Sequence, residues 1–245
     1  MVPTHQSLSG SSDEDLLRRM VETHPERYGP DFWAFFSASV GASRPPRPAM
    51  IDLGCGPGLL LRDLAERYPG STLYGYDVTP AMVAYARQLS YGTAKATLAL
   101  LDVATQPLPH DAGTVHLVTM SSVLHVFDEP LGTLAEIRRV LAPGGLFVLQ
   151  DWIRQPLQTY LAYRRDVLKE PPAESVRRGF RLFPAHNKYT TEDWQWLLAE
   201  AGFTLLDQTQ LRASHRIFVA TPTVPPDQAR NAFMAVTSAG VPPKR

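Results

Sequence analysis

The sequence predicts an α/β protein with a mostly parallel sheet and helices on both faces. From about residue 49 to residue 220, short apolar segments typical of strands alternate with segments whose leucines recur at helical spacing. Three glycines alternate with other residues in the turn after the first of these strands. The last two strand-like segments, "TLLDQTQL" and "HRIFVAT", have no helix between them, which predicts a hairpin that adds an antiparallel strand at one edge.

The first half of this region contains three strand signals and two helix signals. "AMIDL" predicts a short buried strand, and "LLLRDLAERY" predicts the helix that follows it. "STLYGYD" predicts a second strand that ends at Asp77. "TPAMVAYARQL" predicts a helix with Thr79 as its cap and Pro80 at its first position. "ATLALLD" predicts a third strand, which ends at Asp102.

The second half continues the alternation. "TVHLVTMS" predicts a fourth strand, "EPLGTLAEIRRVL" a helix that "APGG" stops, and "LFVLQDW" a fifth strand. "YTTEDWQWLLAEAGF" predicts a helix with Thr190 as the cap, Asp193 three places on and Gly202 as the stop signal.

Three parts of the chain lie outside this pattern. Residues 13–40 are predicted to be helical and end in the aromatic cluster "DFWAFF", for which core packing and a lid role both stay open. Residues 153–189 are predicted to be irregular. The tail after "TPTVPP" is expected to hold one short helix, "DQARNAFMAV", or to be mobile. We therefore expect an N-terminal cap or lid (1–44), a central domain (45–222) with an insertion (153–189), and a tail (223–245).

The composition narrows the class of protein. Lys+Arg and Asp+Glu both number 24, so no basic face is forced, and we expect no nucleic-acid partner. The single cysteine, Cys55, excludes a disulfide within the chain. No secretion signal or membrane-spanning stretch is evident, so we expect a cytoplasmic protein without a membrane partner. The spacing of Cys and His predicts no metal site. Monomer and homodimer both stay open.

The glycine turn indicates a nucleotide-type ligand. In an open parallel sheet, ligands bind beyond the carboxyl ends of the strands, where glycines let the backbone approach closely. A dinucleotide turn would place its last glycine where Leu59 stands, and no Lys-Ser/Thr pair forms a phosphate loop. The turn therefore favours a nucleoside without a pyrophosphate. Asp77 would accept from the ribose hydroxyls and Asp102 from an adenine amino group.

The motifs "IDLGCGPG", "YGYD", "LLDVATQPLP", "SSVLHVF" and "IRRVLAPGGLFVLQDW" together resemble the class I S-adenosylmethionine (SAM)-dependent methyltransferases, most closely the small-molecule group. The resemblance implies a Rossmann-like seven-stranded sheet of order 3-2-1-4-5-7-6 with strand 7 antiparallel. It also implies SAM as cofactor and S-adenosylhomocysteine (SAH) as product. The cofactor-binding residues that it implies are Asp52, Gly54, Cys55, Gly56, Gly58, Asp77, Val78, Met82, Asp102, Val103 and Ser121. His116 departs from the usual acid of the fourth strand, and we interpret this as a packing difference.

The acceptor pocket is expected in the variable parts of the chain. A sulfonium methyl group is already activated, so the protein mainly aligns the acceptor, and a general base helps if the acceptor is a hydroxyl. His125 is the first candidate for that base and His186 the second, although packing and solvent exposure are the respective alternatives. The expected acceptor-binding residues are Trp33, Asp151, Trp152, Tyr160, Tyr163, Asn187 and Tyr189.

These observations favour methyl transfer to a small molecule, by O- or N-methylation, with a role in biosynthesis. Arginines near the pocket could hold an acidic acceptor. Two other classes stay open. One is a protein of this fold that catalyses a cyclisation or rearrangement, and the other is a non-catalytic SAM-binding module.

Overall fold

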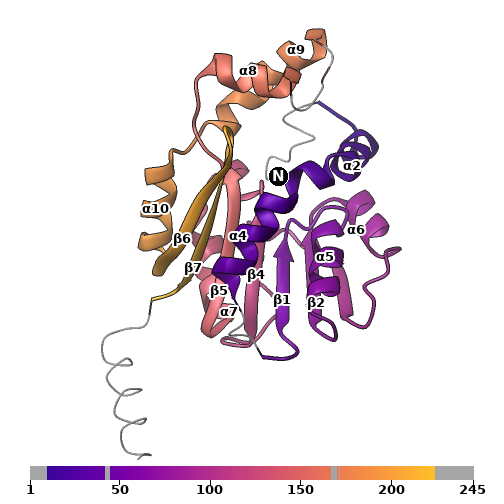
Figure 1. Ribbon diagram of the computed structural model, residues 1–245, viewed down its shortest axis with the longest axis vertical. Coiled ribbons are helices and arrows are strands. Elements are labelled where there is room, and N and C mark those ends of the chain that lie inside the picture. Colours follow the sequence, from indigo (N-terminus) through magenta and orange to yellow (C-terminus); the bar gives the residue numbers. More distant parts are fainter. Residues whose placement is uncertain (1–9, 42–44, 167–169, 171, 224–245) are drawn as a thin grey trace, which may run out of the picture.

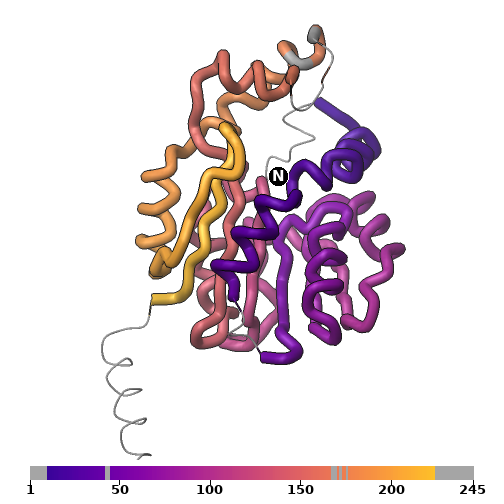
Figure 2. Tube along the Cα trace, in the orientation of Figure 1, coloured from indigo at the N-terminus to yellow at the C-terminus, as the bar shows by residue number. Residues whose placement is uncertain are grey.

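The computed structural model describes residues 10–41, 45–166, 170 and 172–223 of the chain (Figure 1). Its centre is a seven-stranded sheet of order β3-β2-β1-β4-β5-β7-β6. This order confirms the predicted Rossmann-like α/β fold. Figure 2 shows that the first helix (indigo) and the orange helices formed by the insertion lie beyond the same end of the sheet.

The strands confirm the parallel body of the sheet and refine its edge. Parallel pairing joins β1 (Ala49–Leu53), β2 (Thr72–Asp77), β3 (Lys95–Leu100), β4 (Val115–Ser121) and β5 (Leu141–Trp152). β7 (His215–Pro222) runs antiparallel to both β5 and β6 (Phe203–Arg212). The antiparallel strand of the predicted hairpin thus lies one position in from the edge, and β6 forms the edge itself.

The helix α7 ends at Val140, directly before "APGG", as predicted, but β5 begins earlier than expected, at Leu141. Leu141 pairs with Val115, and the register then shifts before Leu117 pairs with Leu146. Gly144 has φ of 72° inside this irregularity, a conformation that glycine adopts without steric cost. The segment that stops the helix is therefore part of β5 itself.

Alternating side chains bury the two faces of the sheet in separate cores. Ile51, Val118 and Phe147 belong to the core under α7 (Leu131–Val140) and α10 (Thr191–Glu200). Their neighbours Met50, Leu117 and Val148 belong to the core on the opposite face, under α5 (Leu59–Arg67) and α6 (Pro80–Ala86). This period of two is what a sheet covered on both faces requires.

The helix caps agree with the sequence signals to different degrees. Thr190 accepts from the backbone N–H of Asp193, and the Asp193 side chain accepts from the backbone N–H of Thr190, which forms the predicted capping box. Thr79 occupies the capping position of α6, but its side chain makes no capping hydrogen bond. α6 ends at Ala86, before the end of the segment that predicted it.

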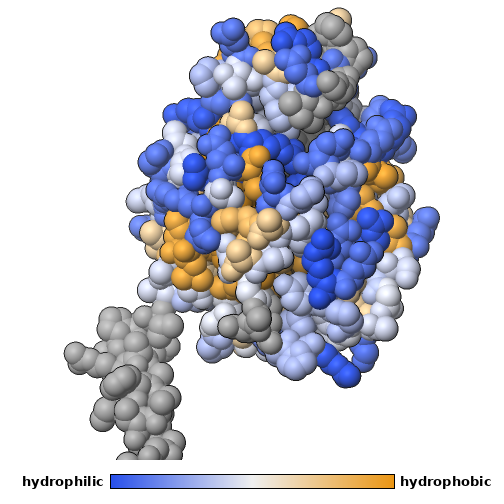
Figure 3. Space-filling view, viewed as in Figure 1, coloured by the Kyte–Doolittle hydropathy of each residue, from blue (hydrophilic) through white to orange (hydrophobic). Residues whose placement is uncertain are grey.

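The N-terminal helices are α2 (Asp13–Glu22), α3 (His24–Arg27) and α4 (Pro30–Val40). Phe32, Phe36 and Val40 of α4 are buried against α5 and the sheet, so "DFWAFF" is largely part of the core. No residue of α2 is buried, and Figure 3 shows mostly hydrophilic side chains over this helix.

The prediction that residues 153–189 are irregular is wrong. They form α8 (Leu157–Asp166) and α9 (Pro172–His186). The prolines that suggested irregularity stand before α8, at the start of α9 and, as Pro184, near the end of α9. Proline is tolerated in a first helical turn, so its presence there does not stop a helix.

Several expectations fall on residues outside the described part of the chain. They include residues 42–44 at the end of the expected N-terminal cap, and the expected tail with its short helix. Within the described ranges, none of the helices has the length and hydropathy needed to cross a bilayer. The described side chains also include no group of three or more His, Cys, Asp or Glu arranged to hold a metal ion.

Candidate functional site

A cavity of about 700 Å³ lies beyond the carboxyl ends of the central strands. One end is lined by Gly54, Asp77 and Asp102, which follow β1, end β2 and follow β3. The other end is lined by side chains from α3, α8, α9 and the β6–β7 hairpin. Helix α2 reaches both ends, because its Met20 lies against Gly56 of the glycine turn and its Arg19 lies 3.6 Å from Glu170. Its volume falls in the range of small-molecule sites, so one cavity can hold a cofactor and an acceptor together.

The glycine turn packs too closely to accept side chains. Gly54, Gly56 and Gly58 have φ of 66°, 52° and 74°, in the left-handed region that favours glycine. A Cβ atom on Gly54 would lie 2.3 Å from Val123 Cγ2, and one on Gly58 would lie 2.8 Å from Ala86 Cβ. The turn is thus held between the β4 end and α6, with its Gly54 backbone at the cavity wall.

Asp77 connects this turn to the end of β2. Its Oδ2 accepts from the backbone N–H of Gly56, and its Oδ1 accepts from that of Thr79, both at 2.8 Å. Burial raises the pKa of Asp77, and these hydrogen bonds oppose the shift. Hydrogen bonds from the Thr79 side chain and the Val78 backbone oppose the shift as well, so the carboxylate of Asp77 is held in place at the cavity wall.

Asp52 is a buried carboxyl group at the end of β1. Its Oδ1 accepts from Thr119 Oγ1 at 2.7 Å. Burial raises the pKa of Asp52 to about 7, while the Thr119 hydrogen bond lowers it. The charge of Asp52 also acts on Tyr28. Burial is the main cause that raises the pKa of Tyr28 to about 12, and the charge of Asp52 raises it further. Tyr28 follows α3 and belongs to no motif, so no sequence pattern predicted it.

The predicted cofactor residues divide into those that line the cavity and those behind its wall. Gly54, Asp77, Val78, Met82, Asp102, Val103 and Ser121 line it. Asp52, Cys55, Gly56 and Gly58 are not among the lining residues. Cys55 is buried, and its Sγ would lie 3.0 Å from a Cβ atom on Gly75. Cys55 therefore packs beneath the turn.

The predicted acceptor residues are also only partly brought together. Trp152, Tyr163 and His186 line the cavity. Asp151 and Tyr160 are fully buried behind it.

Trp33, Asn187 and Tyr189 do not line the cavity. Trp33 lies on α4, with the Arg67 guanidinium carbon 3.4 Å from its ring centroid. Asn187 accepts from the backbone N–H of Gln155, and Tyr189 packs against Trp194.

Two buried histidines have opposite hydrogen-bonding environments. His125 Nδ1 lies 2.6 Å from Asp151 Oδ1, and a carboxylate oxygen accepts, so Nδ1 is the nitrogen that donates in this contact. His186 Nδ1 lies 2.8 Å from the Tyr160 hydroxyl, which accepts from Arg164. A Tyr160 proton donated to Nδ1 satisfies all three groups and places the His186 proton on Nε2.

His186 lines the cavity, whereas His125 is 1% exposed and does not. Their ring centroids are 5.2 Å apart, and the His186 ring stacks on Trp152 at 3.8 Å. As general bases, both candidates thus meet an obstacle. His125 does not reach the cavity, and His186 carries its proton on Nε2. His116 accepts from the backbone N–H of Ala49, in agreement with a packing role.

Four further side chains at the acceptor end were not predicted from the sequence. Ser122 is the one non-glycine residue with positive φ, 57°, in the ranges that the structure describes. Its Oγ lies 3.2 Å from Nε2 of His215, and both residues line the cavity. Backbone strain of this kind often marks functional sites. Arg27 and Arg212 also line the cavity. Ser122 lies in the motif "SSVLHVF", whereas no local motif distinguishes His215, Arg27 or Arg212.

The sheet order, the glycine turn and the acids that follow consecutive strands define a nucleoside-binding α/β protein. Comparisons with known proteins define this class more closely. Residues 51–149 match the family described as a methyltransferase domain. The chain is 32% identical over 137 residues to a trans-aconitate 2-methyltransferase of Methylobacterium nodulans, which covers 55% of this chain and 49% of that protein.

Another relative is a demethylmenaquinone methyltransferase of Thermus thermophilus, 30% identical over 152 residues, with 61% of this chain and 66% of that protein covered. The chain spans about half the length of the curated relatives it matches. The structure of magnesium protoporphyrin IX methyltransferase from Synechocystis PCC 6803 with bound SAH is similar in fold. Its TM-score is 0.58 at 19% identity, over 84% of this chain and 86% of that one.

Residues 51–149 match a methyltransferase domain, and together the similarities support a class I SAM-dependent methyltransferase with SAM as its cofactor. The described residues fit this cofactor. The close-packed turn brings backbone to the cavity wall, Asp77 lines the cavity beside it, and Val78, Met82 and Asp102 line the adjoining wall.

Proposed function

We propose that the protein transfers the methyl group of SAM to a small-molecule acceptor bound in the same cavity. The observation that carries this proposal is the continuity of the cavity, which joins the cofactor residues to the aromatic and charged acceptor end. The names of the two relatives, which refer to trans-aconitate and demethylmenaquinone, support a small acceptor. We also propose that residues 13–40 and 153–189 form the cap around it.

When bound, SAM supplies an activated methyl group: the acceptor lone pair bonds to its carbon while the sulfur–carbon bond breaks and leaves its electrons on sulfur. The residues of this chain hold the two reactants in line. Asp77 and the turn fix the nucleoside, and Trp152 and Tyr163 form part of the acceptor wall. Such positioning supplies most of the rate enhancement expected for this reaction.

A proton must also leave a hydroxyl or protonated amine acceptor. The His186 ring faces the cavity and, as the Nε2–H form, donates a hydrogen bond that orients the acceptor. The His125 ring lies nearby, and its Nδ1 is 2.6 Å from Asp151 Oδ1, so the carboxylate fixes the orientation of the ring. We propose that His186 touches the acceptor and that His125 acts through its neighbours.

Product analysis tests this function. The protein is incubated with methyl-labelled SAM and a mixture of small carboxylic acids, phenols and amines, and SAH is quantified by mass spectrometry. We expect SAH and one labelled methyl product in equal amounts. Conversion of an acceptor without SAH would favour the cyclisation class, and SAM binding without any conversion would favour a binding module.

Single-turnover rates then separate the two histidines. His186→Ala should lower the rate by about 10²-fold, within the range of general acid–base and orienting effects. His125→Ala should lower it less, because its ring does not line the cavity. The reverse order would restore His125 as the acceptor's direct partner.

A further inference from the structure

Five arginines gather where the cap meets the β6–β7 hairpin. Three of them surround one carboxylate: Arg164 pairs with Glu170 at 2.7 Å, and Arg19 and Arg178 each lie 3.6 Å from the same Oε1 atom. Glu170 neutralises only one of these three charges. The other two arginines, Arg27 and Arg212, line the same end of the cavity.

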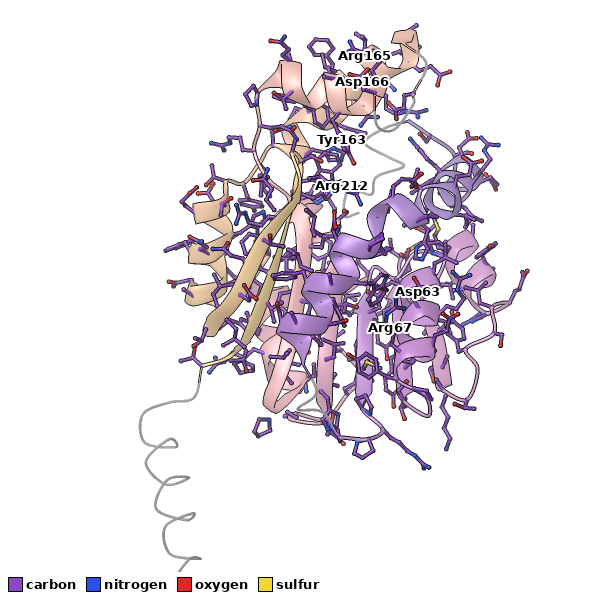
Figure 4. All side chains as sticks on the ribbon, viewed as in Figure 1. Asp63, Arg67, Tyr163, Arg165, Asp166 and Arg212 are labelled. Carbon is purple, nitrogen blue, oxygen red and sulfur yellow. The ribbon has the colours of Figure 1, made fainter. Side chains whose placement is uncertain are left out.

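Arg27 and Arg212 form no ion pair with any residue in the described ranges. Arg212 donates from Nη1 to the Tyr163 hydroxyl at 3.1 Å and from Nη2 to the carbonyl of Glu26. Figure 4 shows Tyr163 and Arg212 facing each other across the junction of the cap and the hairpin. Arg27 donates from Nε to Thr23 Oγ1 at 3.2 Å. Both terminal nitrogens of Arg27 thus keep their donors for another group.

The two guanidinium groups are close enough to disfavour each other's charge. Desolvation is the main cause that lowers the pKa of Arg27, and the charge of Arg212 lowers it further, against the tyrosines 28 and 163. The acidic residues at this end, Asp13, Glu22 and Glu26, form no ion pair with either arginine within the chain as described. Two half-buried cations that share one wall are stabilised by an anion between them.

The chemistry of the pair selects the kind of anion. A guanidinium presents parallel N–H donors that match the two oxygens of a carboxylate. The carbonyl of Glu26 and the hydroxyl of Tyr163 fix the Arg212 fork, so its orientation exists before an acceptor binds. Trp152 and His186 also line the cavity and supply a flat wall for the rest of the molecule.

We propose that Arg27 and Arg212 bind a carboxylate group of the methyl acceptor, so that the substrate class is an organic acid. This inference rests on the proposed methyl transfer and names its substrate class. If the bound carboxylate is itself methylated, one of its oxygens forms the bond to the methyl carbon and no proton has to leave.

Binding of defined probes tests the assignment. The protein is saturated with SAH and titrated calorimetrically with benzoate, succinate and citrate, then with benzamide as the uncharged counterpart of benzoate. We expect at least one of the acids to bind and benzamide to bind at least tenfold more weakly than benzoate. Phenyl phosphate tests a phosphoryl group in the same place.

Variants assign the binding to the two arginines. Arg27→Gln and Arg212→Gln should each weaken binding of the acid about 10- to 100-fold, the effect of losing a hydrogen bond to a charged group. Arg212→Lys keeps the charge without the fork and should give an intermediate loss. Arg165→Gln is the matched control, because Arg165 is an exposed arginine of the same cap paired with Asp166 (Figure 4).

The outcomes separate this inference from the proposed function. SAH affinity and melting temperature, measured first for every variant, report cofactor binding and folding. A protein that fails to bind SAH contradicts the proposed function. Four results overturn the carboxylate assignment alone: no binding of any acid, equal binding of benzamide, Gln variants that bind like Arg165→Gln, or phenyl phosphate binding where no carboxylate binds.

Discussion

The cofactor end of the cavity takes its groups from residues 52–103, whereas the acceptor end takes them from residues as far apart as Arg19 and His215. The cofactor end is built largely from backbone: a turn with positive φ angles and acids that follow consecutive strands. The acceptor end is built from side chains of helices and of a hairpin. A site made of strand ends is fixed by the fold, whereas a site made of distant side chains depends on how the cap packs.

Substitution of Asp77 should have the largest effect and should be confined to the cofactor end. Asp77→Ala removes the carboxylate that we propose accepts from the ribose hydroxyls, and each charge-assisted hydrogen bond lost costs about 1.5–3 kcal/mol, so SAM affinity should fall more than 100-fold. Isothermal titration calorimetry measures this affinity. Asp111→Ala, at an exposed acid before β4, is the control and should leave SAM affinity unchanged. An unchanged affinity in Asp77→Ala would remove the ribose assignment.

Substitution of Phe36 tests how far the cap belongs to the core. Phe36 is 1% exposed, so Phe36→Ala should lower the free energy of unfolding by about 3–5 kcal/mol. Trp33→Ala should cost less, because Trp33 is only partly buried, and should leave the acceptor KM unchanged. Urea denaturation and steady-state kinetics measure the two effects. A raised acceptor KM in Trp33→Ala would return this residue to the acceptor site.

Substitution of Gly54 separates close packing from backbone strain. Gly54→Ala places a methyl group 2.3 Å from Val123 Cγ2, so it should lower SAM affinity about tenfold or more. Gly144→Ala has a similar φ, 72°, but no atom within 4 Å of the added Cβ. Both variants should lose about 1–2 kcal/mol of stability to the left-handed conformation, and only Gly54→Ala should bind SAM more weakly. Equal loss of binding in both would mean that strain, and not packing, matters.

The pH dependence of SAM binding should be the smallest effect. The folded-state pKa of Asp52 is about 7, above its ordinary value of 3.8, so this group stabilises the free protein most below about pH 4. That contribution is lost as the pH rises through about 7, and Asp52 then carries the charge that attracts the amino group of SAM. SAM affinity should therefore rise with pH, by up to about tenfold per unit below pH 7.

Asp52→Asn provides the control for this pH effect. It removes the titrating group, so the slope of SAM affinity between pH 5.5 and 7.5 should flatten. Calorimetry in buffers of different ionisation enthalpy should show a proton released on binding in the wild type only. The same slope in the variant would assign the titration to another group.

Local signals in the sequence determined the order of elements and most of the cofactor end. A carboxylate after a strand and glycines before a helix are consequences of neighbouring residues, so "IDLGCGPG" and "YGYD" predicted their positions in the structure. The same signals failed for residues 153–189, where prolines in first helical turns resembled loop prolines. They also placed the start of the fifth strand after "APGG", whereas β5 already begins at Leu141.

Only the tertiary structure decided the acceptor end. The sequence could not indicate that Arg27 and Arg212, far apart in the chain, share a wall, or that Trp33 turns toward Arg67 instead. Nor could it show that His125 lies behind the cavity wall while His186 and His215 line it. Strand ends meet wherever a parallel sheet forms, because backbone hydrogen bonds fix them. Side chains from a cap and a hairpin meet only through packing across the whole chain, which no local pattern encodes.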